Sequence, residues 1–281
     1  MYDFSSWQQA IKALGIKSGD TVYVASDITL PLRNAYKEGV RTKSDRDNYL
    51  HELINMLQVV VGSEGTLLFP VFTWAFCRGK GFDAKTTLGE VGSLNNWILQ
   101  NRTDFIRTRH PIYSFMVWGR AADLLAALDN ISSWGDNSPF AYLHYNGGKM
   151  LYINVSLQRG LTFMHYVEET EKVPYRYTKA FRGSYTDSRG KTTEKIYTMY
   201  VRDLAIQSAE YMPDEFLLRS GIMQEKFVQD ISLKSLNLNA AYEPLRKDLL
   251  ENGAANFYKF TDYKLNWETK THEDDFSNGL P

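Results

Sequence analysis

The chain has 281 residues, and its 32 Lys and Arg residues nearly balance its 33 Asp and Glu residues, for a formal net charge of -1. This balance argues against nucleic-acid binding through bulk electrostatics, which needs a clear basic excess. Hydrophobic residues make up 43% and charged residues 23% of the chain, as in ordinary globular proteins, so extensive disorder is excluded.

The hydrophobic pattern predicts helices and strands in alternation up to Pro174. The first helix should begin at Ser5 or Ser6 as N-cap and stop at Gly15. In chain order we expect a helix over 4–14, a strand over 19–26, a helix over 44–61, a strand over 66–74, a short helix over 95–100, a strand over 105–119 that breaks at His110-Pro111, a helix over 121–130, a strand over 149–156 and a helix over 161–173. This alternation predicts an α/β fold with a three-layer α/β/α core.

The pattern changes after Pro174. Residues 177–204 alternate and are interrupted by turn signals, which predicts an antiparallel β-hairpin. Helical segments are expected over 215–223 and 239–253. We expect residues 1–270 to form a single domain with this C-terminal hairpin and helical elaboration, and the polar residues 271–281 to form a flexible tail.

The chain contains a single cysteine, Cys77, so neither an internal disulfide nor a Cys-rich zinc site can form. The N-terminal residues lack the basic start and apolar core of a signal peptide, and no apolar run has the length of a membrane span. We therefore expect a cytoplasmic protein with no membrane span and no bound metal.

His165 is the leading candidate for proton transfer near neutral pH. Glu168 follows it by three residues, so the two side chains share a face of a helix, and the carboxylate can orient the ring. On spacing alone, the residues equally fit a solvated acidic helix face. His110 follows Arg107 and Arg109 and precedes Pro111, at a strand broken by this proline. One of the two arginines can face a phosphate there, or all three side chains simply lie on a solvated rim loop.

Cys77 is a second candidate nucleophile, which would need His110 or His165 nearby to form a thiolate. The simpler interpretation is a small buried apolar residue. Gly-rich dinucleotide and phosphate-binding loops, the nucleophile-elbow motif of serine hydrolases and the paired-histidine motif of zinc peptidases are all missing from the sequence, which lowers the expectation for those enzyme classes.

Five segments taken together resemble the aminoglycoside 3-N-acetyltransferases and their antibiotic N-acetyltransferase relatives. The family pattern reads approximately GDTVxVHSSL, GPEGTLVMPTFTW, RSxHPxxSFAAxG, FGExSPLxxLxxxxGKVLLLGV and NTSLHLAE. The matching segments are GDTVYVASDI (19–28), GSEGTLLFPVFTW (62–74), RTRHPIYSFMVWG (107–119), WGDNSPFAYLHYNGGKMLYINV (134–155) and LTFMHYVEE (161–169). They occur in the family's order over the first two thirds of the chain.

The resemblance implies the α/β fold of this family, acetyl-coenzyme A (or another acyl-CoA) as donor, and direct transfer to a substrate amine. It places the family's essential histidine at His165 and its glutamate at Glu168, and a further family acid loosely at Asp203. The resemblance also implies a coenzyme site. We expect it to include donors to the thioester oxygen as it becomes an oxyanion, and groups that hold the phosphates of the coenzyme. The residues expected there are Ser26, Asp27, Thr73, Arg107, Arg109, His110 and Ser114.

This sequence departs from the family pattern around the expected site. Ala25, Asp27 and Thr108 replace a histidine and two serines, and Leu161 and Phe163 replace an asparagine and a serine. We therefore expect an acceptor other than a polycationic antibiotic, such as an amino sugar, free or nucleotide-linked. The alternatives are a relative that binds ligands without catalysis and a Cys-His hydrolase that uses Cys77. A homodimer is also compatible with the sequence.

Overall fold

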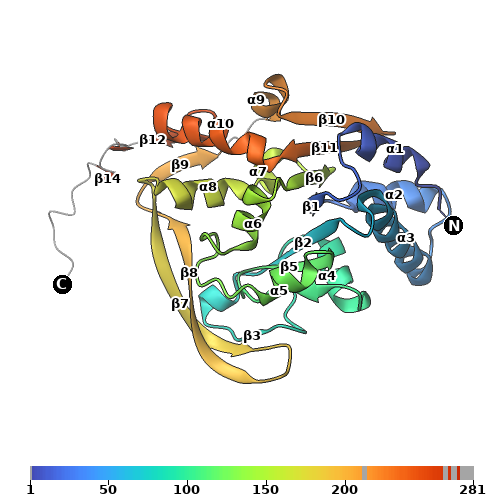
Figure 1. The fold of residues 1–281 in the computed structure, drawn as a ribbon, viewed down its shortest axis with the longest axis horizontal. Coiled ribbons are helices and arrows are strands. Elements are labelled where there is room, and N and C mark those ends of the chain that lie inside the picture. Colours follow the sequence, from blue (N-terminus) through green and yellow to red (C-terminus); the bar gives the residue numbers. More distant parts are fainter. Residues whose placement is uncertain (1, 211–213, 262–264, 267–270, 273–281) are drawn as a thin grey trace.

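A mixed sheet of seven strands lies at the centre of the computed structural model, which describes residues 2–210, 214–261, 265–266 and 271–272 (Figure 1). Its strand order is β10-β11-β6-β1-β2-β5-β4. Strand β1 (Thr21–Ser26) pairs in parallel with β2 (Thr66–Phe72) on one side and β6 (Lys149–Ile153) on the other. The carboxyl ends of these three strands therefore meet at one edge of the sheet, where open α/β sheets commonly bind ligands.

The other described strands pair antiparallel within this sheet or form small separate sheets. They are β3 (Phe82–Asp83), β4 (Ile106–Arg107), β5 (Tyr113–Gly119), β7 (Arg176–Thr186), β8 (Thr192–Arg202), β9 (Gln207–Glu210), β10 (Met223–Val228), β11 (Ile231–Asn237), β12 (Tyr258–Thr261), β13 (Leu265–Asn266) and β14 (Thr271–His272). The helices are α1 (Ser5–Ala13), α2 (Thr29–Lys37), α3 (Lys43–Val61), η1 (Phe76–Arg78), α4 (Ser93–Asn101), α5 (Ala122–Ala127), α6 (Pro139–Tyr145), α7 (Leu157–Gly160), α8 (Phe163–Glu171), α9 (Asp214–Arg219) and α10 (Leu238–Glu251).

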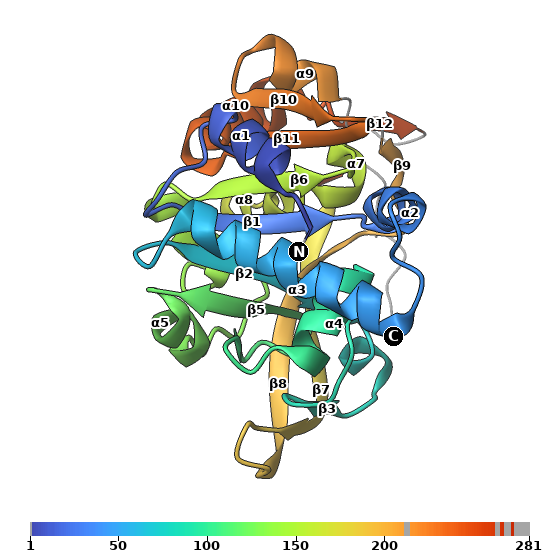
Figure 2. The same cartoon turned by 90° about the vertical axis from the view of Figure 1, so that its right-hand side faces the viewer.

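Side chains of the central strands alternate between two apolar layers, because successive residues of a strand point to opposite faces. Val22 and Val24 of β1 pack with α1, α3 and α4, whereas Tyr23 and Ala25 pack with α5, α6 and α8. Figure 2 shows α1 and α3 in front of the sheet and α8 behind it. This arrangement confirms the expected three-layer α/β/α fold.

The sequence predicted the start of helix α3 better than the start of helix α1. Helix α3 begins with a capping box, in which the amide of Asp45 donates to Thr42 Oγ1 and the amide of Thr42 donates to Asp45 Oδ2. The prediction that Ser5 or Ser6 caps α1 was wrong. Phe4 occupies the N-cap position without a side-chain hydrogen bond, and the amide of Ser5 donates to Asp3 Oδ1 instead.

Several elements were not predicted. Helices α2 and α6 were missed, although Pro139 at the first position of α6 and the Ser138 cap are recognisable start signals. The expected helix over 215–223 was partly wrong, because α9 ends at Arg219 and Met223 begins β10. Strands β10 and β11, which extend the sheet beyond β6, were also missed.

The predicted β-hairpin is present as β7 and β8, which pair from Arg176↔Arg202 to Thr186↔Thr192. Its far end runs past the central sheet, with β3 beside it (Figure 1). A bridge between Ser132 and Thr198 ties the loop after α5 to β8. The hairpin therefore connects the helical layer around α8 to the β5 side of the molecule.

The expected flexible tail lies outside the described residues, apart from the backbone of Thr271–His272, which pairs with Leu265–Asn266. The division into residues 1–270 and 271–281 stays a prediction. Within the described part of the chain, no helix combines the length and apolar character needed to cross a bilayer.

Candidate active site

His165 lies in the first turns of α8, close to the carboxyl ends of the parallel strands. Its amide donates to the carbonyl of Thr162 at 3.0 Å, and the hydroxyl of Tyr23, from β1, donates to Thr162 Oγ1 at 3.4 Å. The neighbours Phe163 and Met164 are fully buried, whereas the side chain of His165 remains 24% exposed. Helix α8 thus carries this ring at the boundary between the core and solvent.

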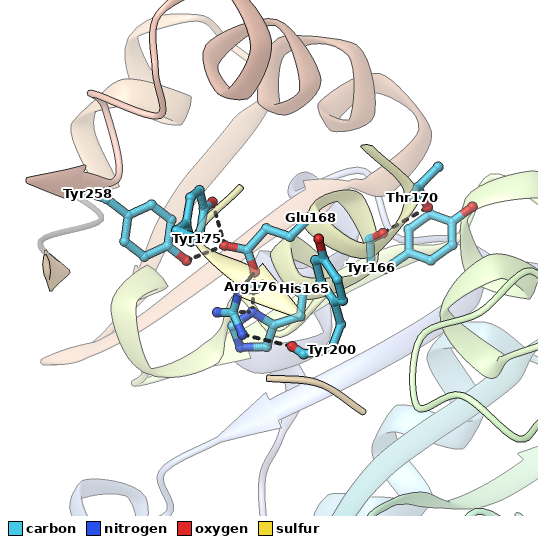
Figure 3. Close-up of polar contacts among 8 residues, drawn as sticks. All are labelled: His165, Tyr166, Glu168, Thr170, Tyr175, Arg176, Tyr200 and Tyr258. Atoms are coloured by element: carbon cyan, nitrogen blue, oxygen red, sulfur yellow. Dashed lines mark hydrogen bonds and ion pairs between the residues drawn. The ribbon is translucent and has the colours of Figure 1, made fainter. Parts of the chain in front are cut away.

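The predicted pair of His165 and Glu168 is in direct contact (Figure 3). His165 Nδ1 lies 2.7 Å from Glu168 Oε2, and the carboxylate is completely buried. The alternative of a solvated acidic helix face is therefore wrong for this carboxylate. It is also wrong for Glu169, which is 7% exposed and accepts a hydrogen bond from Ser132 Oγ.

Glu168 is held by three more groups from distant parts of the chain (Figure 3). Arg176 Nε lies 2.8 Å from Oε2, and the hydroxyls of Tyr175 and Tyr258 each donate to Oε1 at 2.8 Å. We call His165, Glu168, Tyr175, Arg176 and Tyr258 the Glu168 cluster. Its members come from α8, from β7 and the residue before it, and from β12, so the fold itself assembles this site.

The charge state of Glu168 follows from its surroundings. Burial alone would raise the pKa of Glu168, but the positive charge of Arg176 and the hydrogen bond from His165 lower that pKa to about 2. Glu168 is therefore an anion at neutral pH. The guanidinium of Arg176 is 7% exposed and supplies the buried counter-charge.

An ionised Glu168 also selects the tautomer of His165. A carboxylate only accepts hydrogen bonds, so Nδ1 must carry the proton that it donates to Glu168. Arg176 Nη2 lies 3.1 Å from the same nitrogen, but a guanidinium only donates, so this contact is electrostatic and not a hydrogen bond. The second ring nitrogen, Nε2, is then left with a lone pair that can accept a proton.

An aromatic wall lies against the His165 ring. The Trp134 indole packs at 5.0 Å between ring centroids from His165 and at 4.7 Å from Tyr113. Ser133 holds the loop that carries it, because both its amide and its hydroxyl donate to the carbonyl of Thr198. The imidazole is therefore fixed on one side by a carboxylate and on another by an indole.

A cleft of about 720 Å³ opens at the carboxyl ends of β1, β2 and β6. We call it the strand-end cleft; Thr162 is one of its lining residues and lies three positions before His165. Its walls also include Ser26, Asp27, Gly92, Asn95 and Arg159. The cleft thus lies beside the start of α8, which carries the candidate base.

Two buried polar atoms of this cleft have no protein partner: Ser26 Oγ and Asn95 Oδ1. A buried polar atom without a hydrogen bond is destabilising, and such atoms often belong to ligand sites. Asp27 also lines the cleft, and its Oδ1 accepts from the amide of Thr29 at 2.9 Å. Ser26 and Asp27, two of the residues expected to bind the coenzyme, therefore both line this cleft.

Four other residues expected in the coenzyme site hold the protein together in this structure. Thr73 Oγ1 donates to Glu90, and Ser114 Oγ donates to the carbonyl of Val71. Arg107 donates from Nε to Ser114 Oγ and from its Nη atoms to the carbonyls of Val71, Ala84 and Thr87. His110 is 1% exposed; its Nδ1 accepts from the amides of Ile112 and Tyr113, and burial lowers its pKa to about 3. None of these four lines the strand-end cleft.

Arg109 and Asp203 also lie apart from the strand-end cleft. Arg109 is exposed and lines a different cavity. Asp203 Oδ1 accepts from the amide of Ala205, whereas the carboxylate contact to His165 comes from Glu168.

Cys77 does not have the surroundings of a nucleophile. Burial raises the pKa of its thiol to about 11, and no hydrogen bond joins it to a histidine among the residues that the structure describes. Leu161 and Phe163 replace polar residues of the family pattern. Both belong to the apolar core, with exposures of 4% and 0%.

Arg176, Tyr175, Tyr258 and Trp134 were missed by the sequence analysis. Arg176 follows Glu168 by eight residues across a helix end and a strand start, and Tyr258 by ninety, so no helical spacing links them. Only the pairing of an acid on α8 with the arginine that opens the hairpin could have been suspected.

The family model described as aminoglycoside 3-N-acetyltransferase matches residues 45–249, well over half of the chain. The chain belongs to the aminoglycoside 3-N-acetyltransferase family. The family and the enzyme class expected from the sequence, a coenzyme A-dependent N-acetyltransferase, are confirmed.

Solved structures support the same fold. AAC-IIIb in a binary complex with CoASH is 19% identical with a TM-score of 0.69, over 89% of this chain and 97% of that chain. Aminoglycoside acetyltransferase AAC(3)-IIb is 18% identical with a TM-score of 0.70, over 89% and 97%. The YokD protein from Bacillus subtilis is 18% identical with a TM-score of 0.67, over 89% and 100%. No curated protein sequence matches the chain.

No group of three or more His, Cys, Asp or Glu side chains in the described residues is arranged to hold a metal ion.

Proposed function

We propose that this enzyme transfers an acetyl or related acyl group from coenzyme A directly to a primary amine of an amino sugar, with His165 as the general base. The observation that carries the proposal is the buried Glu168 cluster, which orients His165 with Nδ1 protonated and Nε2 free. A base is required because an ammonium has no lone pair to attack a thioester.

The role of each group in the cluster follows from its charge. As Nε2 takes the proton of the amine, the ring becomes an imidazolium, and the anionic Glu168 stabilises that charge. The amine nitrogen bonds to the acyl carbon, the C–S bond breaks, and the coenzyme A thiolate leaves and takes up a proton from the imidazolium or from water. The positive charge of Arg176 keeps Glu168 ionised. The hydroxyls of Tyr175 and Tyr258 donate to the carboxylate and fix its position.

The strand-end cleft is the proposed coenzyme site. Helices α2 and α4 both begin at this cleft, at Ile28–Thr29 and Gly92–Ser93, and neither N-cap residue makes a side-chain capping bond. Helix N-termini attract phosphate through free amides and the helix dipole. Arg159 adds a positive charge, and AAC-IIIb, a protein of the same fold, has been solved with CoASH.

The acceptor that we propose is an amino sugar, free or nucleotide-linked, in preference to a polycationic antibiotic. The β7–β8 hairpin begins in the Glu168 cluster and is strongly basic. Between positions 176 and 202 its cations are Arg176, Lys179, Arg182, Arg189, Lys191, Lys195 and Arg202, and its acids are Asp187 and Glu194. Such a surface disfavours a highly cationic substrate, although AAC-VIa of the same fold has been solved with sisomicin bound.

A panel of amines assayed with acetyl-CoA tests this proposal. Amino sugars, nucleotide-linked amino sugars and aminoglycosides are compared by mass spectrometry of the acetylated product. We expect acetylation of at least one neutral or anionic amino sugar with a higher kcat/KM than any aminoglycoside. Binding of acetyl-CoA without turnover of any amine would contradict the proposal and favour a non-catalytic relative.

A further inference from the structure

A second cavity, of about 920 Å³, lies between β4, α5 and the far end of the β7–β8 hairpin. We call it the hairpin cavity. It shares no lining residue with the strand-end cleft, and neither the proposed coenzyme site nor the Glu168 cluster uses it. Its volume falls in the range of small-molecule sites, about 300–1,000 Å³.

The charge of this cavity is strongly positive, although the whole chain has a net charge of -1. Its acidic lining residues are Asp123 and Asp187. Its basic lining residues are Lys85, Arg102, Arg107, Arg109, Arg189 and Lys195.

Three of these six cations are exposed and form no ion pair within the described residues. In the part of the chain that the structure describes, Lys85, Arg109 and Arg189 form no ion pair, and all three side chains are exposed. Lys195 lies 3.8 Å from Asp129 and packs over the ring of Tyr185 at 4.7 Å. Like charges gathered around one concavity repel one another, so the arrangement is more stable when an anion occupies it.

The other charges of the cavity are already engaged. Arg102 pairs with Asp104 at 2.7 Å, and Arg107 binds backbone carbonyls, so neither is free for a ligand. Asp187 accepts from the amides of Arg189 and Lys191, and these contacts shape the hairpin turn. The turn therefore holds the backbone of Arg189 in place at the rim of the cavity.

The floor of the cavity is apolar. Leu99, Phe105, Met116 and Ala126 line it, and Ile106 is 41% exposed there. A concave site with an apolar floor and unpaired cations at its rim suits a ligand with a flat or apolar body and more than one phosphate charge.

We propose that the hairpin cavity is a second binding site, separate from the strand-end cleft, for a phosphorylated small molecule of nucleotide size. Arg109, from the loop after β4, and Arg189, from the hairpin turn, both line the cavity and bind the phosphates. The apolar floor receives the base or sugar. The site does not depend on the proposed acetyl transfer, because it lies on other residues.

Calorimetric titration of the full chain with ADP tests this site, and two double variants show whether ADP binds in the hairpin cavity or elsewhere. The double variant Arg109→Ala, Arg189→Ala removes two cavity cations. The matched control, Arg182→Ala with Lys191→Ala, removes two exposed cations of the same hairpin that do not line the cavity. Both double variants change the net charge equally. Melting temperatures verify that all proteins are folded.

We expect wild type to bind one ADP and to bind inorganic pyrophosphate more weakly, because pyrophosphate leaves the apolar floor empty. The cavity variant should lose at least about tenfold in affinity, which is about 1.4 kcal/mol, because it lacks two charged donors to the phosphates. The control variant should stay within about threefold of wild type. Equal affinity of the two double variants, equal affinity of wild type for ADP and pyrophosphate, or no binding of ADP would overturn the proposal.

Discussion

Replacing Glu168 by glutamine removes the buried negative charge at the centre of the cluster while it preserves the size of the side chain. Folding lowers the pKa of Glu168 from 4.5 to about 2, because Arg176 and His165 outweigh the effect of burial. This shift corresponds to about 3 kcal/mol of stability at neutral pH. Glu168→Gln would also leave Arg176 buried without a counter-charge. Removing one partner of a buried ion pair generally lowers the free energy of unfolding by about 3–5 kcal/mol.

The stability that Glu168 contributes should decrease as the pH falls. A carboxylate with a lowered pKa contributes its full stability above about pH 4.5 and loses it as the pH falls through about 2. Urea denaturation at pH 7 should therefore show a loss of about 3 kcal/mol for Glu168→Gln. The difference between wild type and Glu168→Gln should shrink as the pH is lowered from 4.5 towards 2.

The adjacent Glu169 provides a matched control on the same helix. Burial raises the pKa of Glu169, so its anion is disfavoured in the folded state. Glu169→Gln should leave the stability at pH 7 unchanged or slightly higher, because the amide oxygen can still accept from Ser132. Equal destabilisation by the two substitutions would refute the reasoning that Glu168 is the anion that Arg176 stabilises.

Three further predictions concern residues that the structure assigns to the scaffold. Arg107→Lys should lower the free energy of unfolding by about 1–3 kcal/mol, because backbone carbonyls lose their donors, and leave the KM for acetyl-CoA unchanged. Arg109→Lys, at an exposed neighbour, should stay within about 0.5 kcal/mol of wild type, and a raised KM in Arg107→Lys would contradict its structural role. Cys77→Ser should leave the rate of acetylation unaltered. Because burial raises the pKa of the thiol to about 11, wild type should also react slowly with thiol reagents at neutral pH. A tenfold loss of activity in Cys77→Ser would show that Cys77 acts as a nucleophile. The ring of His110, whose pKa burial lowers to about 3, should show no titration by NMR between about pH 5 and 8, and a midpoint in that interval would contradict its burial.

The candidate base was predictable because its partner is local. His165 and Glu168 are three residues apart on one helix, and helical geometry alone brings them together. Whether that pair faces solvent or the core depends on Arg176 and Tyr258, which reach it from another strand and from the C-terminal region. Local spacing contains no information about such contacts. The sequence alone therefore could not distinguish a solvated acidic helix face from a buried pair.

The same distinction applies to the residues expected in the coenzyme site. The motif around His110 and Ser114 does lie at a strand break, where His110 accepts from the amide of Ile112 and Ser114 donates to the carbonyl of Val71 on the neighbouring strand. Ser26 and Asp27 follow a parallel strand, and the carboxyl end of such a strand does predict a ligand edge. Strands β10 and β11 were missed because they join the sheet only through pairing with β6, a non-local contact.

The most direct test of the account is the rate of acetyl transfer by His165→Ala at saturating acetyl-CoA and amine. The imidazole is 24% exposed, and Arg176, Tyr175 and Tyr258 still hold Glu168 without it, so the variant should fold and bind coenzyme A as wild type does, which calorimetry can verify. We expect kcat to fall by about 10²–10⁴-fold, the usual contribution of a general base. Turnover near the wild-type rate, with coenzyme binding intact, would show that another group removes the proton.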